Sequence, residues 1–426
     1  MAPAEGEKAA TTEFVREAFR HHYESTRPQL PDRFGRREFG FMFWSAGIVQ
    51  RHLGFSREED LRHFLTTRAP AHVYYSSAYY EKPDAPTMEE KGWLGADLVF
   101  DLDADHIPTA KQMTYPEMLE AVRLKIVKLY DEFLRKDFGF EDDRMRIVFS
   151  GGRGYHVHVF DERVWSLGSH ERREIVDWVT GKGLDVDAAF RESAFDSREF
   201  QGRVRVKKRL VAPGQDDVGW RGKVYRGMTQ LASRLETMTP EAAVAFLASF
   251  EGVKESEAED LYENLFKTRT TKPRVIRGVD RLREGQIEAL SDKSRDLLIR
   301  IVKDLQQIRI DEYKGMPLEG VVQRGETDEP VTSDIKRLIR MPSSLHGKTG
   351  LGVMHLTRDA VDGFRPLRDA VPSTWTEESV RMRLADRINL EIRDEAFNLA
   401  PGVNTVPQYL AIFLAARGLA TVVPEA

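Results

Sequence analysis

One stretch of this 426-residue chain, residues 95–160, constrains the fold more than any other part of the sequence. In residues 98–103 a strand period of two places Leu98, Phe100 and Leu102 on one face. Apolar residues recur at steps of three and four over residues 117–136, which predicts an amphipathic helix. Two further strands are predicted at 146–150 and 155–160, around a glycine turn. This order of elements predicts an α/β or α+β core.

The remainder of the chain predicts a discontinuous core. At roughly 150 residues per domain, the length corresponds to two or three domains, or to one core with an insertion. Residues 228–310 contain several helix-like segments and are interpreted as an all-α insertion. We therefore assign residues 1–227 and 311–366 to the core, and residues 367–426 to a mainly helical C-terminal segment packed on it.

Composition excludes several classes of protein. The chain has no cysteine, so it can form no disulfide, no cysteine-based zinc site and no thiolate-held iron–sulfur cluster. Its 64 Lys and Arg against 69 Asp and Glu give a net charge of -5, so any polyanion site must be a local patch. The first ten residues lack the apolar region of a signal peptide, and the apolar run 409–416 is too short to cross a bilayer. We expect a soluble, cytoplasmic protein without membrane contact.

The other face of the 98–103 strand carries Asp101 and Asp103. Two carboxylates at this spacing lie roughly 7 Å apart and share a face, so they can converge on one or two divalent cations. A solvated turn that also contains Asp105 is the alternative interpretation. Because the strand before them is predicted to be buried, their mutual repulsion must be neutralised, which favours the cation site.

The glycine turn carries Ser150, Arg153 and His156 in the sequence SGGRGYH. Glycines let the backbone approach a ligand closely, and Arg153 can bind phosphate oxygens in a fork. A plain hairpin with a surface arginine is the alternative. A metal pair made by His156 and His158 is disfavoured because no third ligand is evident nearby.

A third motif spans residues 328–350. Asp328 could complete a three-carboxylate metal site, with Asp334 as a competitor, and His346 and Lys348 are donors suited to a triphosphate. Taken alone, the basic residues around Arg340 would be interpreted as a solvated helix face.

The three motifs together resemble the small catalytic subunit of the archaeal and eukaryotic DNA primases, in its archaeal form. The resemblance rests on FDLDAD, SGGRGYHVHVFD and VTSDIKRLIRMPSSLHGKTGL, with support from RREF and VPQYLAIFLAARG. It implies a two-sheet core with an open cleft, and primer synthesis on single-stranded DNA from nucleoside triphosphates with two Mg²⁺ or Mn²⁺ ions. It also implies metal ligands and nucleotide-binding residues at these positions: Asp101, Asp103 and Asp328 for the metals; Ser150, Arg153, His156, His346, Lys348, Arg340 and Arg37 for the nucleotide.

The chain departs from this family at one place. Archaeal members commonly carry a zinc knuckle soon after the acidic pair, whereas the corresponding segment here, residues 108–117, has no cysteine. The resemblance implies a heterodimer with a primase large subunit that carries the iron–sulfur domain. The basic clusters 203–209 and 267–283 could follow a template backbone or simply be solvated surface. The alternatives are an end-joining polymerase of the same superfamily and a non-catalytic DNA-binding paralogue.

Overall fold

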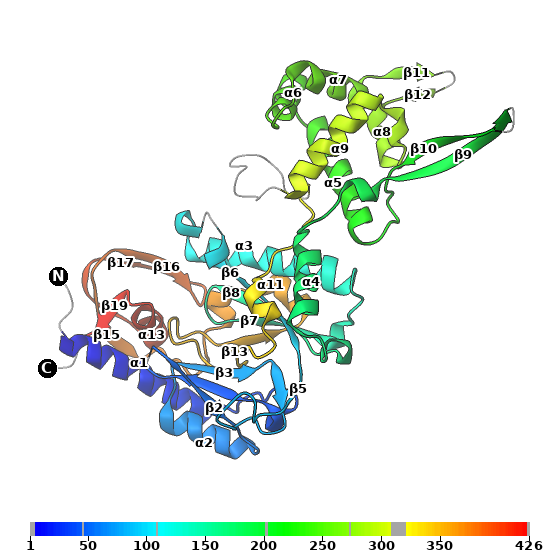
Figure 1. Ribbon diagram of the computed structural model, residues 1–426. Coiled ribbons are helices and arrows are strands. Elements are labelled where there is room, and N and C mark those ends of the chain that lie inside the picture. Colours follow the sequence, from blue (N-terminus) through cyan, green and yellow to red (C-terminus); the bar gives the residue numbers. More distant parts are fainter. Residues whose placement is uncertain are drawn as a thin grey trace. The chain divides into compact units, whose positions relative to one another are not determined.

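The computed structural model describes residues 5–44, 47–107, 110–200, 203–271, 274–307 and 321–423. The chain divides into two compact units, residues 1–176 with 326–426, and residues 177–325 (Figure 1). The mixture of helices with several small sheets confirms the predicted α+β class. None of the helices that the structure describes has the length and apolar character needed to cross a membrane.

The first unit contains two four-stranded sheets whose paired strands run antiparallel. The first sheet has the order β13 (Leu338–Arg340), β3 (His72–Ser76), β1 (Phe39–Met42), β2 (Val49–Leu53). The second has the order β14 (Met354–Leu356), β7 (Met145–Phe149), β8 (Gly154–Val159), β6 (Leu98–Asp103). In each sheet one edge strand, β13 or β14, comes from residues 338–356, far along the chain from the strand that it joins.

Helices and short hairpins complete this unit. Its longer helices are α1 (Glu5–Ser25), α2 (Glu58–Arg68), α3 (Tyr115–Lys128), α4 (Ser169–Thr180), which continues into the second unit, and α13 (Gln408–Ala416). Its short helices are α10 (Glu329–Ser333), α11 (Arg358–Gly363) and α12 (Pro366–Asp369). A further ladder joins β4 (Ala78–Tyr80) to β5 (Trp93–Ala96).

The strand and helix predicted first, β6 and α3, pack as the sequence pattern requires. Phe100 and Leu102 are buried, and α3 lies against β6 and β8. α3 begins with a capping box between Thr114 and Glu117, so its first turn is fixed locally. It continues as a π-helical turn over Leu129–Arg135, which completes the predicted helix. The polar face of β6 therefore points away from α3.

The C-terminal segment is mainly strand, so the prediction of a mainly helical segment over 367–426 is wrong. Its elements are β15 (Ser379–Leu384), β16 (Ile388–Ile392), β17 (Glu395–Leu399), β18 (Gly402–Pro407) and β19 (Ala420–Val422), with α13 as the only helix of eight or more residues among those described there. In β15, Met382 and Leu384 are buried whereas Arg381 and Arg383 are exposed. This alternation has the period of a half-buried strand, not of a helix.

The second unit, residues 177–325, has its own apolar core. Its helices are α5 (Gly219–Glu236), α6 (Pro240–Ala248), α7 (Glu255–Phe266), α8 (Gly278–Arg283) and α9 (Asp292–Gln307). It also contains two ladders, β9 (Arg191–Phe200) with β10 (Arg203–Val211), and β11 (Arg269–Thr271) with β12 (Arg274–Ile276).

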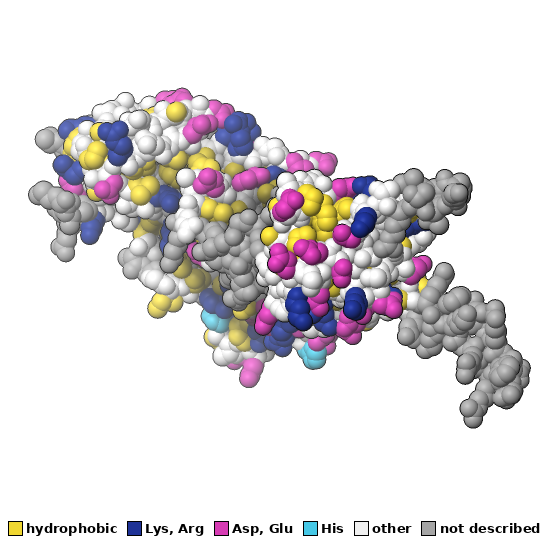
Figure 2. Space-filling model, turned by 90° about the horizontal axis from the view of Figure 1, so that it is seen from above, with side chains coloured by type: hydrophobic (Ala, Val, Ile, Leu, Met, Phe, Trp, Pro, Cys, Tyr) yellow, Lys and Arg dark blue, Asp and Glu magenta, His cyan; other side chains and the backbone are white. Residues whose placement is uncertain are grey.

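The insertion predicted over 228–310 falls within this unit but is not all-α, because β11 and β12 lie inside it. β-Branched Thr, Val and Ile in these two strands favour extended backbone. The unit begins near residue 177, ahead of the predicted boundary. Space-filling Figure 2 shows acidic and basic side chains interspersed on the face that it presents.

Candidate active site

Asp101 and Asp103 lie on the face of β6 that points away from α3. In the ladder with β8, Asp101 stands opposite His156 and Asp103 opposite Gly154. Nε2 of His156 lies 3.2 Å from Oδ1 of Asp101, and Oδ1 of Asp103 accepts a 2.9 Å hydrogen bond from the main-chain N–H of Asp105. Both carboxylates remain partly exposed, at 22% and 32% of their side-chain surface. The buried alternate residues anchor the strand and hold the pair at the surface.

The glycine turn between β7 and β8 is held from inside by Ser150. Its Oγ accepts hydrogen bonds from the main-chain N–H groups of Gly152 and Gly154, each at 3.3 Å. A side chain at Gly152 would place its Cβ 2.9 Å from Nε2 of His346. Glycine is therefore needed here because the His346 ring packs directly on the turn.

His346 is buried, and Lys348 is exposed beside it. Nδ1 of His346 lies 3.2 Å from Oγ1 of Thr349, and the ring meets that of His72 edge-on at 4.8 Å. Burial, together with the positive charge of Arg340 and other nearby cations, holds the pKa of His346 well below its usual value. His346 is therefore a neutral ring that can donate or accept a hydrogen bond, whereas the Lys348 ammonium makes no ion pair within the described part of the chain.

Two arginines bring positive charge close to the carboxylate pair. Arg153 forms an ion pair with Asp105, and its Nη2 lies 3.8 Å from Oδ1 of Asp103. Arg340, at the end of β13, places Nη1 2.6 Å from Nδ1 of His72. Burial lowers the pKa of Arg340, and the negative charges of Asp101 and Asp103 act in the opposite direction. The site thus combines fixed cations with two acidic side chains.

These side chains line one open cavity of about 560 Å³. The residues that line it are Asp101, Asp103, Asp105, Ser150, Gly152, Arg153, His156, Arg340, His346, Lys348, Thr349, Ala416 and Arg417. β6, β8 and the glycine turn belong to the second sheet, and Arg340 belongs to the first, so both sheets contribute to the cavity. The structure therefore brings together eight of the ten residues predicted from the sequence, and it adds Arg417, which the sequence reasoning missed.

Arg417 follows directly after α13 and stacks on an aromatic side chain. Its guanidinium carbon lies 4.5 Å from the centre of the Tyr115 ring, and the Tyr115 hydroxyl donates to the main-chain oxygen of Gly152. This contact ties the C-terminal helix to the glycine turn. In the sequence, Arg417 closes the apolar run 409–416 and lies in the stretch VPQYLAIFLAARG that supports the family resemblance, but neither feature assigned it to a site.

The main chain of Asp328 is bonded to β6 beside the carboxylate pair. Its N–H donates a 3.0 Å hydrogen bond to the main-chain oxygen of Asp101. Asp328 is also the N-cap residue directly before α10, whereas Asp334 is the C-cap residue directly after that helix. The carboxylate of Asp334 accepts a hydrogen bond from the main-chain N–H of Lys336. Of the two candidates, Asp328 is the one whose backbone the fold attaches to β6.

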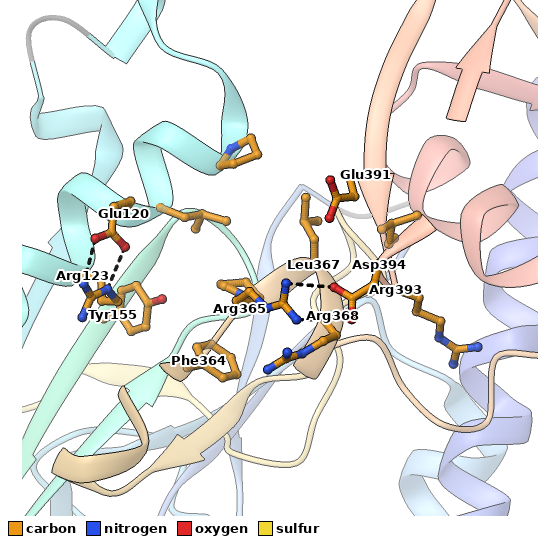
Figure 3. A pocket seen from close by; sticks show the side chains of 14 residues that line it. Glu120, Arg123, Tyr155, Phe364, Arg365, Leu367, Arg368, Glu391, Arg393 and Asp394 are labelled. Carbon is orange, nitrogen blue, oxygen red and sulfur yellow. Dashed lines mark hydrogen bonds and ion pairs between the residues drawn. The ribbon is translucent and has the colours of Figure 1, made fainter. Parts of the chain in front are cut away.

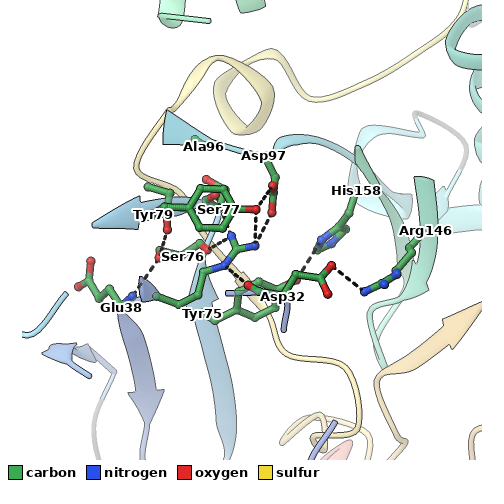
Figure 4. Close-up of polar contacts among 12 residues, drawn as sticks. Asp32, Glu38, Tyr75, Ser76, Ser77, Tyr79, Ala96, Asp97, Arg146 and His158 are labelled. Atoms are coloured by element: carbon green, nitrogen blue, oxygen red, sulfur yellow. Dashed lines mark hydrogen bonds and ion pairs between the residues drawn. The ribbon is translucent and has the colours of Figure 1, made fainter. Parts of the chain in front are cut away.

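Arg37 lies outside the cavity, in a buried network of its own. Figure 4 shows its partners Ser76, Tyr79 and Asp97. Its side chain is 2% exposed, and its Nη2 forms a 2.6 Å ion pair with Oδ2 of Asp97. Its remaining N–H groups donate to these acceptors: the main-chain oxygens of Asp32, Ser76 and Ser77 and the Tyr79 hydroxyl. With its donors engaged inside the protein, Arg37 has none to direct at a nucleotide in the cavity.

The donor set fits a hard divalent cation through its two carboxylates. Asp101 and Asp103 present oxygen atoms, which Mg²⁺ and Mn²⁺ prefer, to an open and polar cavity. Within the described residues, no three His, Asp or Glu side chains are grouped closely enough to form a metal site as they stand. For Asp328 to serve as a third ligand, the three carboxylates would have to lie closer together than they do here.

Comparison with known proteins gives a consistent family. A family model described as DNA primase small subunit matches residues 100–355. A relative named DNA primase small subunit PriS from Methanocella arvoryzae is 39% identical over 97% of this chain and 99% of its own length. The proteins of the same name from Methanococcoides burtonii and Natronomonas pharaonis are 37% and 38% identical, each over 96% of this chain and 98% of its own length. The match to the family model includes all three motifs that line the cavity.

Proposed function

The chain belongs to the DNA primase small-subunit family, and on that premise we propose that it synthesises short primers on single-stranded DNA by metal-dependent nucleotidyl transfer. In this reaction the 3′ oxygen of the growing primer forms a bond to the α-phosphorus of an incoming nucleoside triphosphate. The bond from that phosphorus to the bridging oxygen breaks, and pyrophosphate leaves. The observation that carries the proposal is the single cavity in which the β6 carboxylates face the cationic side chains of two loops.

Asp101 and Asp103 are the proposed ligands of Mg²⁺ or Mn²⁺, with Asp328 as the third. When bound, these metals would lower the pKa of the attacking hydroxyl and offset the charge that develops on the phosphates. The position of Asp328 supports its choice over Asp334, because its N–H is bonded to the main chain of Asp101.

Cationic and neutral donors of the cavity are proposed to bind the triphosphate. Arg153 and Lys348 supply positive charge. His346 supplies one N–H donor, because its lowered pKa keeps the ring neutral, with a proton on one nitrogen only. Donors fixed in place stabilise the charge that grows on the leaving pyrophosphate better than mobile water does. Ser150 acts by holding the glycine turn, since its hydroxyl already accepts from two main-chain N–H groups.

Arg340 and Arg417 are proposed to extend this electropositive lining on the side of β13 and α13. Neither residue forms an ion pair with an acidic residue among those described. Partly desolvated arginines without acidic partners favour binding of phosphate groups. We assign Arg417 to the nucleotide or to the phosphates of the primer or template.

Heterodimer formation with a primase large subunit is also proposed, since the relatives are named as small subunits. The clusters 203–209 and 267–283 are proposed to follow the template backbone. For most of these residues the side chains lie outside the described part of the structure. The segment 108–117, where relatives of the archaeal type were expected to carry a zinc knuckle, includes the start of α3.

Primer synthesis on a circular single-stranded template tests the proposal. Labelled ribonucleotides and deoxyribonucleotides would be compared separately, with and without the large subunit, for the wild type and for Asp101→Asn. We expect de novo products that need a divalent metal and are lost in the variant. Extension of an annealed primer without any de novo product would favour the repair polymerase instead, and template binding without incorporation would favour a non-catalytic protein.

A further inference from the structure

A second cavity lies on the face of the β6–β8 ladder opposite the carboxylate pair. Tyr155 alternates with His156 along β8, so its side chain points to the side that α3 covers. There a cavity of about 270 Å³ is enclosed by residues of α3, β8, α12 and β16 (Figure 3). Its apolar walls include Leu119, Phe364 and Ile392. Its volume is of the order of one or two aromatic rings, slightly below the range of about 300–1,000 Å³ for ligand pockets.

Tyr155 is one of the residues that line this cavity, and it carries a buried hydroxyl. The side chain is fully buried, and its Oη has no hydrogen-bond partner among the residues that the structure describes. Figure 3 shows the hydroxyl pointing toward the cavity, near Phe364. Burial raises the pKa of Tyr155, so the hydroxyl keeps its proton and can donate. A buried hydroxyl without a partner is unfavourable, and a ligand with a polar edge would satisfy it, whereas a hydrocarbon would not.

The aromatic walls favour a flat ring. The rings of Tyr155 and Phe364 meet edge to face, with their centroids 6.5 Å apart and an angle of 79°. A guest ring that enters this corner can add further edge-to-face or offset contacts. The cavity therefore fits a ring that is flat, largely apolar on its faces and polar at one edge.

The charged rim disfavours an anionic ligand. Its four arginines are already paired: Arg123 with Glu120, Arg365 with Asp394, Arg368 with Asp369 and Arg393 with Glu377. Glu391 is exposed at the rim and forms no ion pair within the described residues. The unpaired charge at this rim is thus the negative charge of Glu391. In the catalytic cavity the unpaired charge is the positive charge of Lys348.

We propose that this cavity is a binding site for a neutral heteroaromatic ring of the nucleobase class, carried by an unphosphorylated nucleoside. The Tyr155 hydroxyl bonds to a ring nitrogen or exocyclic oxygen, and the ring packs against Phe364 and Leu119. The site is separate from the catalytic cavity and prefers a neutral ligand to an anionic one. Gly154, the residue before Tyr155, stands opposite Asp103 in the β6–β8 ladder. A ligand in this cavity would therefore contact the pair of strands that carries the carboxylates.

Binding of adenosine, guanosine, cytidine and uridine to the full-length protein tests this inference, with ATP as the charged comparison. Binding would be measured by calorimetry and by ligand-observed NMR in the absence of metal. We expect saturable binding of at least one nucleoside, weakened about 3- to 10-fold in Tyr155→Phe, which removes one hydrogen bond. Leu367→Trp, which fills the cavity from its rim, should abolish it. Lys348→Ala should leave nucleoside binding unchanged but weaken ATP binding.

Three results would each overturn the proposal: no saturable nucleoside binding to the wild type, unchanged binding in Tyr155→Phe, or loss of nucleoside binding in Lys348→Ala. The last would place the nucleoside in the catalytic cavity. Tyr155→Phe keeps the ring and the packing, so it remains decisive even if Leu367→Trp fails to fold. The inference does not rest on the proposed function, because the assay requires neither metal nor template.

Discussion

The main-chain N–H of Asp328 donates a hydrogen bond to the main-chain oxygen of Asp101 across 3.0 Å. More than two hundred residues separate the two positions in the chain, and the second unit is inserted between them. The bond fixes the start of α10 against β6, at the strand that also carries Asp103. It distinguishes two aspartates that the sequence left as competitors.

Asp328→Asn is therefore predicted to lose far more primer synthesis than Asp334→Asn. The first variant removes a carboxylate beside the proposed metal pair, whereas the second alters a side chain that caps the main chain at Lys336. Initial rates with saturating metal would be compared, after both variants are shown to unfold at similar temperatures. Equal losses would contradict the choice of Asp328.

Asp101→Asn and Asp103→Asn are each expected to lower incorporation by at least about two orders of magnitude, the scale of losing a group that stabilises transition-state charge. Asp105→Asn is the matched control, because Asp105 lines the same cavity but pairs with Arg153. We expect it to retain more than a tenth of the activity. Full activity in Asp101→Asn or Asp103→Asn would remove the basis for the metal site.

Arg37→Met is predicted to destabilise the fold rather than to weaken nucleotide binding. Removing one partner of a fully buried ion pair leaves Asp97 uncompensated and typically costs about 3–5 kcal/mol. Urea unfolding measures the loss. The folded fraction should keep its KM for nucleotides. A rise in KM without destabilisation would instead indicate that Arg37 binds the nucleotide.

Arg417→Ala is expected to raise the KM for nucleotides or template about 10-fold, since a half-buried, cavity-lining cation is lost. If Arg417 contacts a DNA phosphate, template binding by the variant should depend less steeply on salt concentration. Arg381→Ala is the control, because Arg381 is exposed on β15 and does not line the cavity. Identical kinetics for the two variants would exclude Arg417 from substrate binding.

Acid pH should destabilise the protein through the half-buried side chain of His22. Burial lowers the pKa of His22 to about 4 from an ordinary value of 6.5. Between these values the unfolded chain binds more protons than the folded one, so stability falls as pH falls below about 6.5. This one residue contributes at most about 1.4 kcal/mol per pH unit. His22→Asn should show a shallower loss in urea unfolding between pH 6.5 and pH 4.5, and an unchanged slope would contradict the assignment.

Residues whose role depends on local pattern were predictable from the sequence. The alternation that buries Phe100 and Leu102 also dictates that Asp101 and Asp103 share the opposite face, because strand geometry has a period of two. The glycine turn was evident for a similar reason. Where a pattern was mistaken, as in β15, the alternation was present but short, and the apolar run of α13 beside it suggested a helix.

Residues whose role depends on distant contacts were not predictable. Arg37 and Arg417 are both arginines next to aromatic or apolar runs, and their sequence contexts do not show which one faces the cavity. Only tertiary packing placed Arg37 against a buried carboxylate and placed Arg417 in the cavity, with no carboxylate partner among the described residues.

By itself, the sequence determined the strand faces, the glycine turn and the chemical types gathered in three motifs, because these follow from the local geometry of the backbone and from the chemistry of each side chain. The tertiary structure alone decided that the motifs line one cavity, that Asp328 rather than Asp334 is bonded to the main chain of Asp101, and that Tyr155 faces a second cavity. These facts depend on strand pairings and helix contacts between segments far apart in the chain, which no local pattern encodes.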